Sequence, residues 1–349
     1  MLLSEIDKNF AVDVSIDKTG LKFYSVDEAP FKIYGVWREK DYYTRVPIDV
    51  AETVSVQVLA NARKTAGGRV RFVTDSARIA IIAKFWEIPE NSPHMTFASK
   101  AAVDIYEGEY FMQTFMPPAT LQNGAFESVR TFEPGEKVIT LNMPPYGALG
   151  QLYVGIDEGA TLKEAPDYKY EKPVVYYGSS ITQGGCVSRP GMAYPAVLSR
   201  RLDCNYINLG FSGGARGEKN IVDYMAALDM GVFVCDYDHN AVDPAYLRQT
   251  HEPIYRAVRA NHPDVPILFL TRPSVVPLGE REERLAVIKA TYDKAVAEGD
   301  KNVYFFDSSK FFPANGQEHT VDNCHLTDWG FQMMANGIEP TLRKLLESI

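Results

Sequence analysis

The 349-residue sequence has few cysteines and no long apolar segment. Its four cysteines, at positions 186, 204, 235 and 324, are far apart and show neither a CxxC pair nor a Cys/His spacing typical of zinc. We therefore expect reduced thiols and a cytoplasmic location. No stretch approaches the roughly 20 apolar residues that cross a bilayer, and the first residues lack the basic start and apolar run of a signal peptide. We expect no membrane partner.

Clusters of basic residues are also missing. The chain has 45 acidic against 36 basic residues, which gives a net charge of −9. An anionic surface repels phosphate backbones, so we expect no nucleic-acid partner, and a neutral substrate fits better. The six histidines show no ligand-like spacing, so neither a metal nor an organic cofactor is expected.

Up to residue 157 the sequence is typical of successive β-strands. Runs rich in β-branched and aromatic residues begin at Val54, Arg69 and Ala77, and further runs broken by Gly, Pro and Asn continue to Asp157. This pattern predicts an antiparallel β-sandwich over residues 1–157. The polar segment 158–172, which contains Pro166, is the predicted linker.

From residue 173 onward, short apolar runs alternate with segments of helical length. The runs are Val174–Gly178, Tyr206–Gly210, Val232–Asp236, Ile267–Thr271 and Val303–Asp307. Strands without polar alternation are buried on both faces, as in a parallel sheet covered by helices. Residues 173–349 are therefore predicted to form a three-layer α/β domain. Ligand sites of such domains lie at the carboxyl ends of the strands.

Residues with chemical potential follow these predicted strands. Ser180 follows the first strand in a Gly-Ser-Ser turn, and a glycine-rich segment, 208–214, follows the second. Asn240 follows the third strand and offers a side-chain amide, although alone it could simply cap the next helix. Asp322 precedes His325 by three residues, so its carboxylate could accept from Nδ1 and leave Nε2 free to take a serine proton. Each of these motifs alone is commonly only a turn or a polar group without a chemical role. Their order, at successive strand ends and before the last helix, favours a common functional site.

That order resembles the SGNH, or GDSL, hydrolase superfamily. Its blocks correspond to Gly178-Ser179-Ser180, Gly213, Asn240 and Asp322 with His325. The resemblance implies a five-stranded parallel sheet of flavodoxin-like order, Ser180 as nucleophile and the Asp322–His325 pair as its base. It also implies an oxyanion hole made by the backbone N–H groups of Ser180 and Gly213 and the side chain of Asn240. Ser179 replaces the usual Asp, and DHNA replaces GxND in the third block.

The longer stretches GSSITQGGCVSRPGMAYP and NLGFSGGARGE resemble a narrower group, the two-domain SGNH enzymes with an N-terminal β-sandwich. Related arrangements occur in carbohydrate esterases that remove acetyl groups from plant polysaccharides or their oligosaccharides. By this resemblance residues 1–157 would be a jelly-roll-like accessory domain that could bind carbohydrate. The resemblance implies a serine esterase acting on acetylated oligosaccharides such as those of mannan or xylan. An acyltransferase using the same site and a glycan-binding protein on a decayed scaffold remain alternatives. An α/β-hydrolase is set aside because no GxSxG elbow is recognised in the sequence. The rival base His319 lacks an Asp three residues earlier.

Three further residues are candidates for substrate contact. Trp37 lies in an aromatic and charged segment, and exposed aromatic rings can stack on the apolar faces of sugars. Arg216 and Trp329 lie near the predicted catalytic blocks in the sequence. For all three, a structural packing role is the alternative interpretation. A homo-oligomer is a further expectation.

Overall fold

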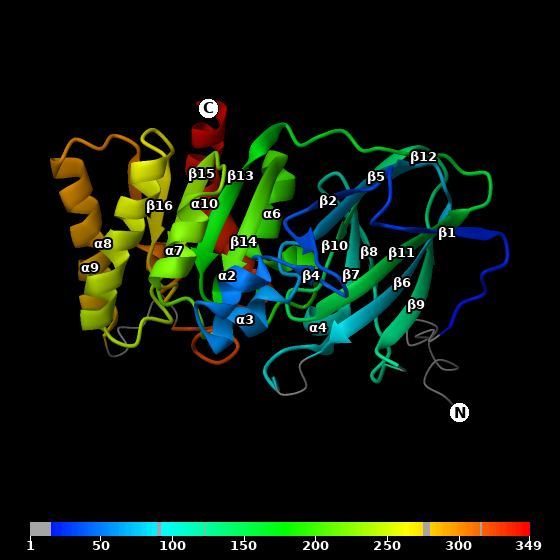
Figure 1. The fold of residues 1–349 in the computed structure, drawn as a ribbon, viewed down its shortest axis with the longest axis horizontal. Coiled ribbons are helices and arrows are strands. Elements are labelled where there is room, and N and C mark those ends of the chain that lie inside the picture. The colour runs from blue at the N-terminus through cyan, green and yellow to red at the C-terminus, as the bar shows by residue number, and fades with distance from the viewer. Residues whose placement is uncertain (1–14, 89–91, 122, 275–279, 315) are drawn as a thin grey trace. The chain divides into compact units, whose positions relative to one another are not determined.

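The computed structural model describes residues 15–88, 92–121, 123–274, 280–314 and 316–349 (Figure 1). The chain divides into two compact units that are not continuous in sequence. The first consists of residues 1–44, 63–167 and 188–191, and the second of residues 45–62, 168–187 and 192–349.

The first unit contains two antiparallel sheets. One has the order β1 (Leu21–Ser25), β11 (Ala148–Asp157), β6 (Arg78–Glu87) and β9 (Ala125–Thr131). The other has the order β12 (Leu162–Lys163), β5 (Arg69–Thr74), β10 (Lys137–Asn142), β7 (Val103–Glu107) and β8 (Tyr110–Phe115), and β2 (Lys32–Tyr34) also pairs with β5. Buried residues of both sheets, such as Ile81 of β6 and Ile139 of β10, belong to one hydrophobic core. The unit is therefore a β-sandwich, as the sequence predicts. The ribbon β3 (Trp37–Arg38) and β4 (Tyr43–Thr44) and the short helix α4 (Phe97–Ala101) complete it.

The second unit is a five-stranded parallel sheet with helices on both faces. Its strand order is β14 (Cys204–Gly210), β13 (Tyr170–Gly178), β15 (Val232–Asp236), β16 (Ile267–Leu270) and β17 (Val303–Phe306). One core joins the sheet to α2 (Ile48–Glu52), α3 (Val56–Ala62), α7 (Lys219–Ala226), α8 (Pro244–Asn261) and α9 (Arg281–Ala297). The other core joins it to α5 (Ser180–Gln183), α6 (Tyr194–Leu202) and α10 (Asp328–Glu347). Neighbouring residues of one strand, such as Tyr176 and Tyr177 of β13, lie in opposite cores, which explains the unbroken apolar runs.

The α/β prediction is confirmed. The strand order corresponds to the flavodoxin-like order 2-1-3-4-5, and each predicted strand of residues 173–349 overlaps an observed one. The carboxyl ends of β13 and its two neighbours are in register, because Gly178 pairs with Gly210 on one side and with Asp236 on the other. The residues that follow these strands therefore meet at one edge of the sheet.

The predicted strand beginning at Val54 is wrong. Residues 56–62 form helix α3, which the Ser55 hydroxyl begins by accepting a hydrogen bond from the backbone N–H of Val58. Val58 and Ala62 are buried in the core of the α/β unit, so helical spacing brings one face of the segment onto the parallel sheet. The β-branched residues that favoured a strand are outweighed by this tertiary packing. The segment 45–62 consequently belongs to the second unit, whereas the sequence places it within 1–157.

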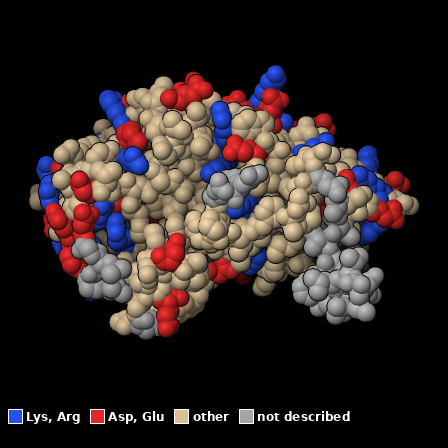
Figure 2. Space-filling model, turned by 90° about the horizontal axis from the view of Figure 1, so that it is seen from below, with Lys and Arg blue, Asp and Glu red and all other residues tan. Residues whose placement is uncertain are grey.

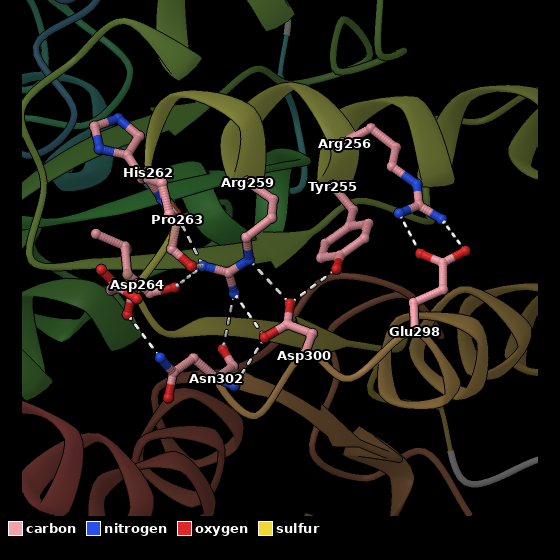
Figure 3. A network of polar contacts seen from close by, with 10 residues as sticks. Tyr255, Arg256, Arg259, His262, Pro263, Asp264, Glu298, Asp300 and Asn302 are labelled. Carbon is pink, nitrogen blue, oxygen red and sulfur yellow. Dashed lines mark hydrogen bonds and ion pairs between the residues drawn. The ribbon is translucent and has the colours of Figure 1, made fainter.

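The far end of the α/β unit is held by a polar network (Figure 3). Arg259 on α8 donates to both carboxylate oxygens of Asp300, in the loop between α9 and β17, and Tyr255 donates to the same carboxylate. Arg256 pairs with Glu298 at the end of α9. These bonds fix α8 against the start of β17, at the edge opposite the strands' carboxyl ends.

Acidic and basic side chains are interspersed on the face that Figure 2 shows, so the net charge of −9 does not gather there in one patch. Among the described residues, no helix has the length and apolarity needed to cross a membrane.

Candidate functional site

Ser180 is the first residue of α5, directly after β13. Gly178 allows this turn, because a Cβ there would lie 2.1 Å from the Thr182 hydroxyl and 2.8 Å from the Asp236 carbonyl oxygen. Ser179 is the N-cap residue, and its hydroxyl accepts a hydrogen bond from the Ile181 N–H. Ser179, which replaces the usual Asp, therefore still caps the helix.

His325 and Asp322 form a hydrogen-bonded chain that ends at Ser180. The Ser180 Oγ lies 2.9 Å from His325 Nε2, and His325 Nδ1 lies 2.8 Å from Asp322 Oδ2. Because a carboxylate only accepts hydrogen bonds, Nδ1 carries the proton and Nε2 of the neutral ring accepts from the serine hydroxyl. This arrangement can move a proton from Ser180 to the imidazole.

The turn from Asp322 to His325 fixes the geometry of this chain. Asp322 Oδ1 accepts from the backbone N–H of His325 at 2.8 Å and of Cys324 at 3.2 Å, and Asn323 adopts a left-handed conformation with φ 63°. Burial alone would raise the pKa of Asp322, but the hydrogen bonds and charge of His325 outweigh burial and lower it. The carboxylate therefore stays ionised beside the imidazole at neutral pH.

Gly213 and Asn240 belong to two loops that are tied together. Gly213 has φ 68°, a conformation that favours glycine. Asn240 Nδ2 donates to the carbonyl oxygen of Phe211 at 2.9 Å, and the Phe211 N–H donates to the Gly178 carbonyl oxygen at 2.8 Å. One hydrogen of the Asn240 amide thus orients this side chain on the glycine-rich loop, and the amide has a second hydrogen to donate.

Two arginines hold the loop that carries Asn240. Buried Asp238 accepts from Arg272 through both the side chain, at 2.7 Å, and the backbone N–H, at 3.0 Å. Arg284 donates to the carbonyl oxygens of Asp238 and Ala241, on either side of Asn240. These contacts supply a fixed backbone where the third block lacks its usual glycine.

His239 lies beside the Asp322–His325 turn. Its Nδ1 is 3.8 Å from Cys324 Sγ, and its buried Nε2 has no hydrogen-bond partner among the described residues. Burial lowers the pKa of His239 to about 4, and the charge of Asp238 opposes this shift only in part. The ring is therefore uncharged at neutral pH. Burial also raises the pKa of Cys186 to about 12, so this neighbouring thiol stays protonated.

A fully buried acid lies beneath the turn that presents Ser180. Asp236, at the end of β15, accepts from the Thr182 hydroxyl at 2.8 Å and from the Tyr194 hydroxyl at 3.2 Å. Burial raises its pKa from 3.8 to about 7, and the charge of Asp238 adds to the rise. Asp236 thus connects α5 and α6 to the end of the neighbouring strand.

Sequence reasoning missed the support that segment 45–62 gives to the glycine-rich loop. The buried guanidinium of Arg45 donates to the carbonyl oxygens of Asn208, Gly210 and Asn61, each within 2.8 Å, and lies over the ring of Phe211. Asn61 on α3 donates to the carbonyl oxygen of Ser212. No local pattern marks this role, because more than 140 residues separate Arg45 from the loop.

A second serine has a motif that the sequence interpretation overlooked. Residues 210–214 read Gly-Phe-Ser-Gly-Gly, which fits the GxSxG pattern of α/β-hydrolase nucleophiles. Ser212, however, uses its backbone N–H to bind Gln183 and its carbonyl oxygen to bind Asn61, whereas His325 meets Ser180. The rival histidine His319 is fully buried, and its Nε2 lies 2.9 Å from the carbonyl oxygen of Pro273.

The three candidate substrate contacts have different surroundings. Trp37 is 41% exposed on β3 of the first unit, and Trp329 is 47% exposed in the first turn of α10, four residues after His325. Arg216 is half-buried; its carbonyl oxygen accepts from Tyr237, and its charge acts on Glu218. The structure joins Ser180, His325 and Asp322 through direct hydrogen bonds. It also ties Asn240 to Phe211, in the loop that contains Gly213.

Comparisons with known proteins agree with this architecture. Residues 171–343 match the GDSL-like Lipase/Acylhydrolase family, and residues 21–162 match the family described as the N-terminus of Esterase_SGNH_hydro-type. Among curated proteins, none matches the chain significantly.

Several solved structures share the fold. A Bacteroides ovatus protein named as a GDSL-like lipase has a TM-score of 0.83 at 27% identity, over 94% of this chain and 98% of that one. A salicylyl-acyltransferase from a tetracycline biosynthetic pathway has a TM-score of 0.74 at 17% identity, over 93% and 98% of the two chains. An acetyl xylan esterase from the rumen bacterium Butyrivibrio proteoclasticus has a TM-score of 0.60 at 14% identity, over 94% and 99%.

Proposed function

Because residues 171–343 match the GDSL-like Lipase/Acylhydrolase family and the chain is a carboxylic ester hydrolase, we propose that it removes O-acetyl groups from acetylated oligosaccharides through an acyl-enzyme on Ser180. The observation that carries this proposal is the chain of hydrogen bonds from Ser180 through His325 to Asp322.

The proposed reaction has two halves. Ser180 Oγ attacks the ester carbonyl carbon while His325 Nε2 takes the hydroxyl proton, and Asp322 stabilises the imidazolium that forms. His325 then gives this proton to the departing alcohol oxygen, which leaves an ester between the acyl group and Ser180. Water attacks that ester with His325 again acting as base, and acetate and free Ser180 are released.

The charge on the carbonyl oxygen requires donors during both attacks. We assign this role to the backbone N–H groups of Ser180 and Gly213 and to the second hydrogen of the Asn240 amide. Support comes from the bond of Asn240 to Phe211, which holds the amide at the loop containing Gly213. Preorganised donors of this kind stabilise the transition state because they need no reorientation when the charge develops.

The acetyl and carbohydrate parts of the proposal rest on the two-domain resemblance. Structures of the same fold include the acetyl xylan esterase and a family two carbohydrate esterase from Clostridium thermocellum described in complex with cellohexaose. We propose that Trp37, Arg216 and Trp329 contact the substrate. The 41% and 47% exposure of the two indoles leaves them open for stacking on a sugar ring.

An acyltransferase is the second candidate, because a salicylyl-acyltransferase shares the fold over 93% of this chain. It would use the same acyl-enzyme but pass the acyl group to an acceptor other than water. A decayed glycan-binding protein is a weaker candidate, because the hydrogen-bonded Ser180–His325–Asp322 set is intact.

The test measures acetate release from acetylated xylan and mannan oligosaccharides by the wild type and by Ser180→Ala and Ser212→Ala. We expect Ser180→Ala to lose release by at least a thousandfold and Ser212→Ala to retain it. Equal loss in Ser212→Ala would contradict the assignment of the nucleophile. If the wild type cleaves 4-nitrophenyl acetate but releases no acetate from the oligosaccharides, the esterase assignment stands and the glycan substrate is rejected. Acyl transfer to added alcohols in preference to water would favour the acyltransferase.

Two further expectations remain part of the proposal. All four cysteines are free thiols, which supports a cytoplasmic location. A homo-oligomer is expected, and light scattering of the purified protein measures it directly.

A further inference from the structure

Cys324 and His239 form a contact that the proposed reaction does not use. Cys324 lies within the turn from Asp322 to His325, and its Sγ is 3.8 Å from Nδ1 of His239. His239 directly precedes Asn240, and both contacting segments belong to the α/β unit. The contact therefore joins the turn that carries the proposed base to the loop that carries a proposed oxyanion donor.

The loop around His239 is firmly held. Asp238 is buried and accepts two hydrogen bonds from Arg272, and Arg284 donates to the carbonyl oxygens of Asp238 and Ala241. Burial lowers the pKa of His239 to about 4, so the ring is uncharged at neutral pH and can accept a hydrogen bond at Nδ1. The ring is thus an acceptor fixed on a rigid loop.

Cys324 can supply the matching donor. Burial raises the pKa of its thiol, and the charge of Asp322 adds to the rise, so the sulfur keeps its proton at neutral pH. A thiol is only a weak hydrogen-bond donor. We therefore expect the contact to matter more for where the turn lies than for the free energy of folding.

The turn needs an attachment of this kind. Asp322 and Asn323 are exposed, and the bonds from Asp322 Oδ1 to the backbone N–H groups of Cys324 and His325 stay within the turn. Its side chains reach distant segments through His325, which meets Ser180, and through Cys324. In an acyl-enzyme, Ser180 Oγ is an ester oxygen without a proton, so it can no longer donate to His325.

We propose that Cys324 and His239 are positioning residues that hold His325 in place while Ser180 carries the acyl group. In that state His325 Nε2 takes a proton from water, the water oxygen bonds to the acyl carbon, and Ser180 Oγ then leaves with this proton. The base has lost its bond to Ser180 by then, whereas acylation does not alter the Cys324–His239 contact. This role rests on the proposed acyl-enzyme mechanism but not on the identity of the acetylated substrate.

The test measures acylation and deacylation separately, by stopped-flow hydrolysis of 4-nitrophenyl acetate with the wild type and Cys324→Ala. We expect deacylation to slow about tenfold in the variant, because a displacement of about 1 Å can cost about a hundredfold in rate. Acylation should change little, since Ser180 still binds the base at that stage. The acyl-enzyme should therefore accumulate and give a burst of 4-nitrophenol. Equal slowing of both steps, or unchanged deacylation, would overturn the positioning role.

A second variant tests the partner of the thiol. His239→Leu removes the acceptor and should slow deacylation as much as Cys324→Ala does. Because the two side chains act through one contact, the double variant should be no slower than either single variant. Effects that multiply in the double variant would show that the residues act independently and would reject their joint role.

Cys235→Ala is the matched control. Cys235 Sγ lies 4.0 Å from Nε2 of His251, in a second thiol–imidazole contact that is buried in the core of the same unit. We expect this substitution to leave both rate constants unchanged. Slowed deacylation in Cys235→Ala as well would show a general effect of losing a buried thiol and reject a specific role for Cys324.

Ser180→Ala in the same assay separates the positioning role from the proposed function. Loss of cleavage in Ser180→Ala together with unchanged deacylation in Cys324→Ala would retain the nucleophile and reject the positioning role. Cleavage that persists in Ser180→Ala would reject the acyl-enzyme mechanism itself. Melting temperatures of all variants show whether a change in rate comes from unfolding.

Discussion

Asp322 has two tasks that a single substitution separates. It binds the backbone of His325 through one oxygen and the imidazole through the other. In Asp322→Asn the backbone bond can persist, but the ionised acceptor that fixes the proton on Nδ1 is lost. We expect kcat to fall by a factor on the order of 10⁴, as in comparable triads, with little change in KM.

Steady-state kinetics with 4-nitrophenyl acetate measures this effect, and an unchanged melting temperature serves as the control. A loss of less than tenfold would show that Asp322 does not orient the base. Because the pKa of Asp322 is lowered, its contribution to stability is complete above the ordinary pKa of an Asp. That contribution is lost only as the pH falls through the lower, folded-state value.

Asp236 changes stability with pH in the opposite direction to Asp322. Its folded pKa of about 7 lies above its ordinary value of 3.8, so between these values the folded protein retains a proton that the unfolded chain releases. The free energy of unfolding therefore decreases as the pH rises from about 4 to 7, by up to about 1.4 kcal/mol per pH unit from this group. Asp236→Asn retains acceptors for Thr182 and Tyr194 without the charge, and should remove this slope.

Urea unfolding of both proteins at pH 5, 6, 7 and 8 tests the expectation. The difference in stability between Asp236→Asn and the wild type should grow in favour of the variant up to about pH 7 and then level off. A difference that is the same at every pH would show that Asp236 titrates normally in the folded state.

At the scale of elements, segment 45–62 supports the glycine-rich loop after β14. Arg45 provides three hydrogen bonds to backbone carbonyls, and an unmade bond at a buried carbonyl costs about 1–3 kcal/mol. We expect Arg45→Met to lower the free energy of unfolding by about 2–4 kcal/mol and to reduce kcat, because the loop that contains Gly213 loses its support.

Arg248→Met, at an exposed arginine, is the matched control and should change neither the free energy of unfolding nor kcat. Chemical unfolding and esterase kinetics measure both effects; normal kcat in Arg45→Met would remove the link to the loop.

The sequence predicts elements well where local pattern decides them. The strand run Val232–Asp236 matches β15 residue for residue, because a buried parallel strand has a continuous apolar signature. The Ser180 and His325 positions also follow from strand ends and spacing. The helix at Val56–Ala62 could not be predicted from its β-branched residues, because what decides it is packing on a sheet whose strands begin more than 100 residues later. The supporting roles of three further groups could not be predicted for the same reason, because their partners lie far along the chain. These groups are Arg45, Asp236 and the Arg272–Asp238 pair.

At the scale of the whole molecule, each of the two units is made of segments that alternate along the chain with segments of the other unit. Residues 45–62 leave the sandwich portion of the sequence to pack in the α/β unit, and residues 188–191 do the reverse. In the second case Arg189 and the Gly191 N–H both bind the buried carboxylate of Asp104 on β7. Cutting the chain at the predicted linker therefore removes interactions from both units.

A fragment comprising residues 168–349 tests this directly. It contains Ser180, His325 and Asp322 but lacks Arg45 and α3, so the carbonyls of Asn208 and Gly210 lose their donor and Val58 and Ala62 leave the core. We expect the fragment to be aggregated or partly unfolded and to have at most about 1% of wild-type esterase activity. Light scattering and circular dichroism report its state. A folded, fully active fragment would show that segment 45–62 is dispensable.

The alternation of the chain between its units limits how this architecture can diversify. A domain joined by one linker can be exchanged by a single recombination event in the gene, because everything it needs is inherited as one block. Here a crossover at residues 158–172 would combine one parent's Arg45 and α3 with the other parent's glycine-rich loop, and such chimaeras succeed only when that interface is compatible. New specificities in this architecture are therefore expected to arise by substitution within an inherited pair of domains and not by exchange of whole domains.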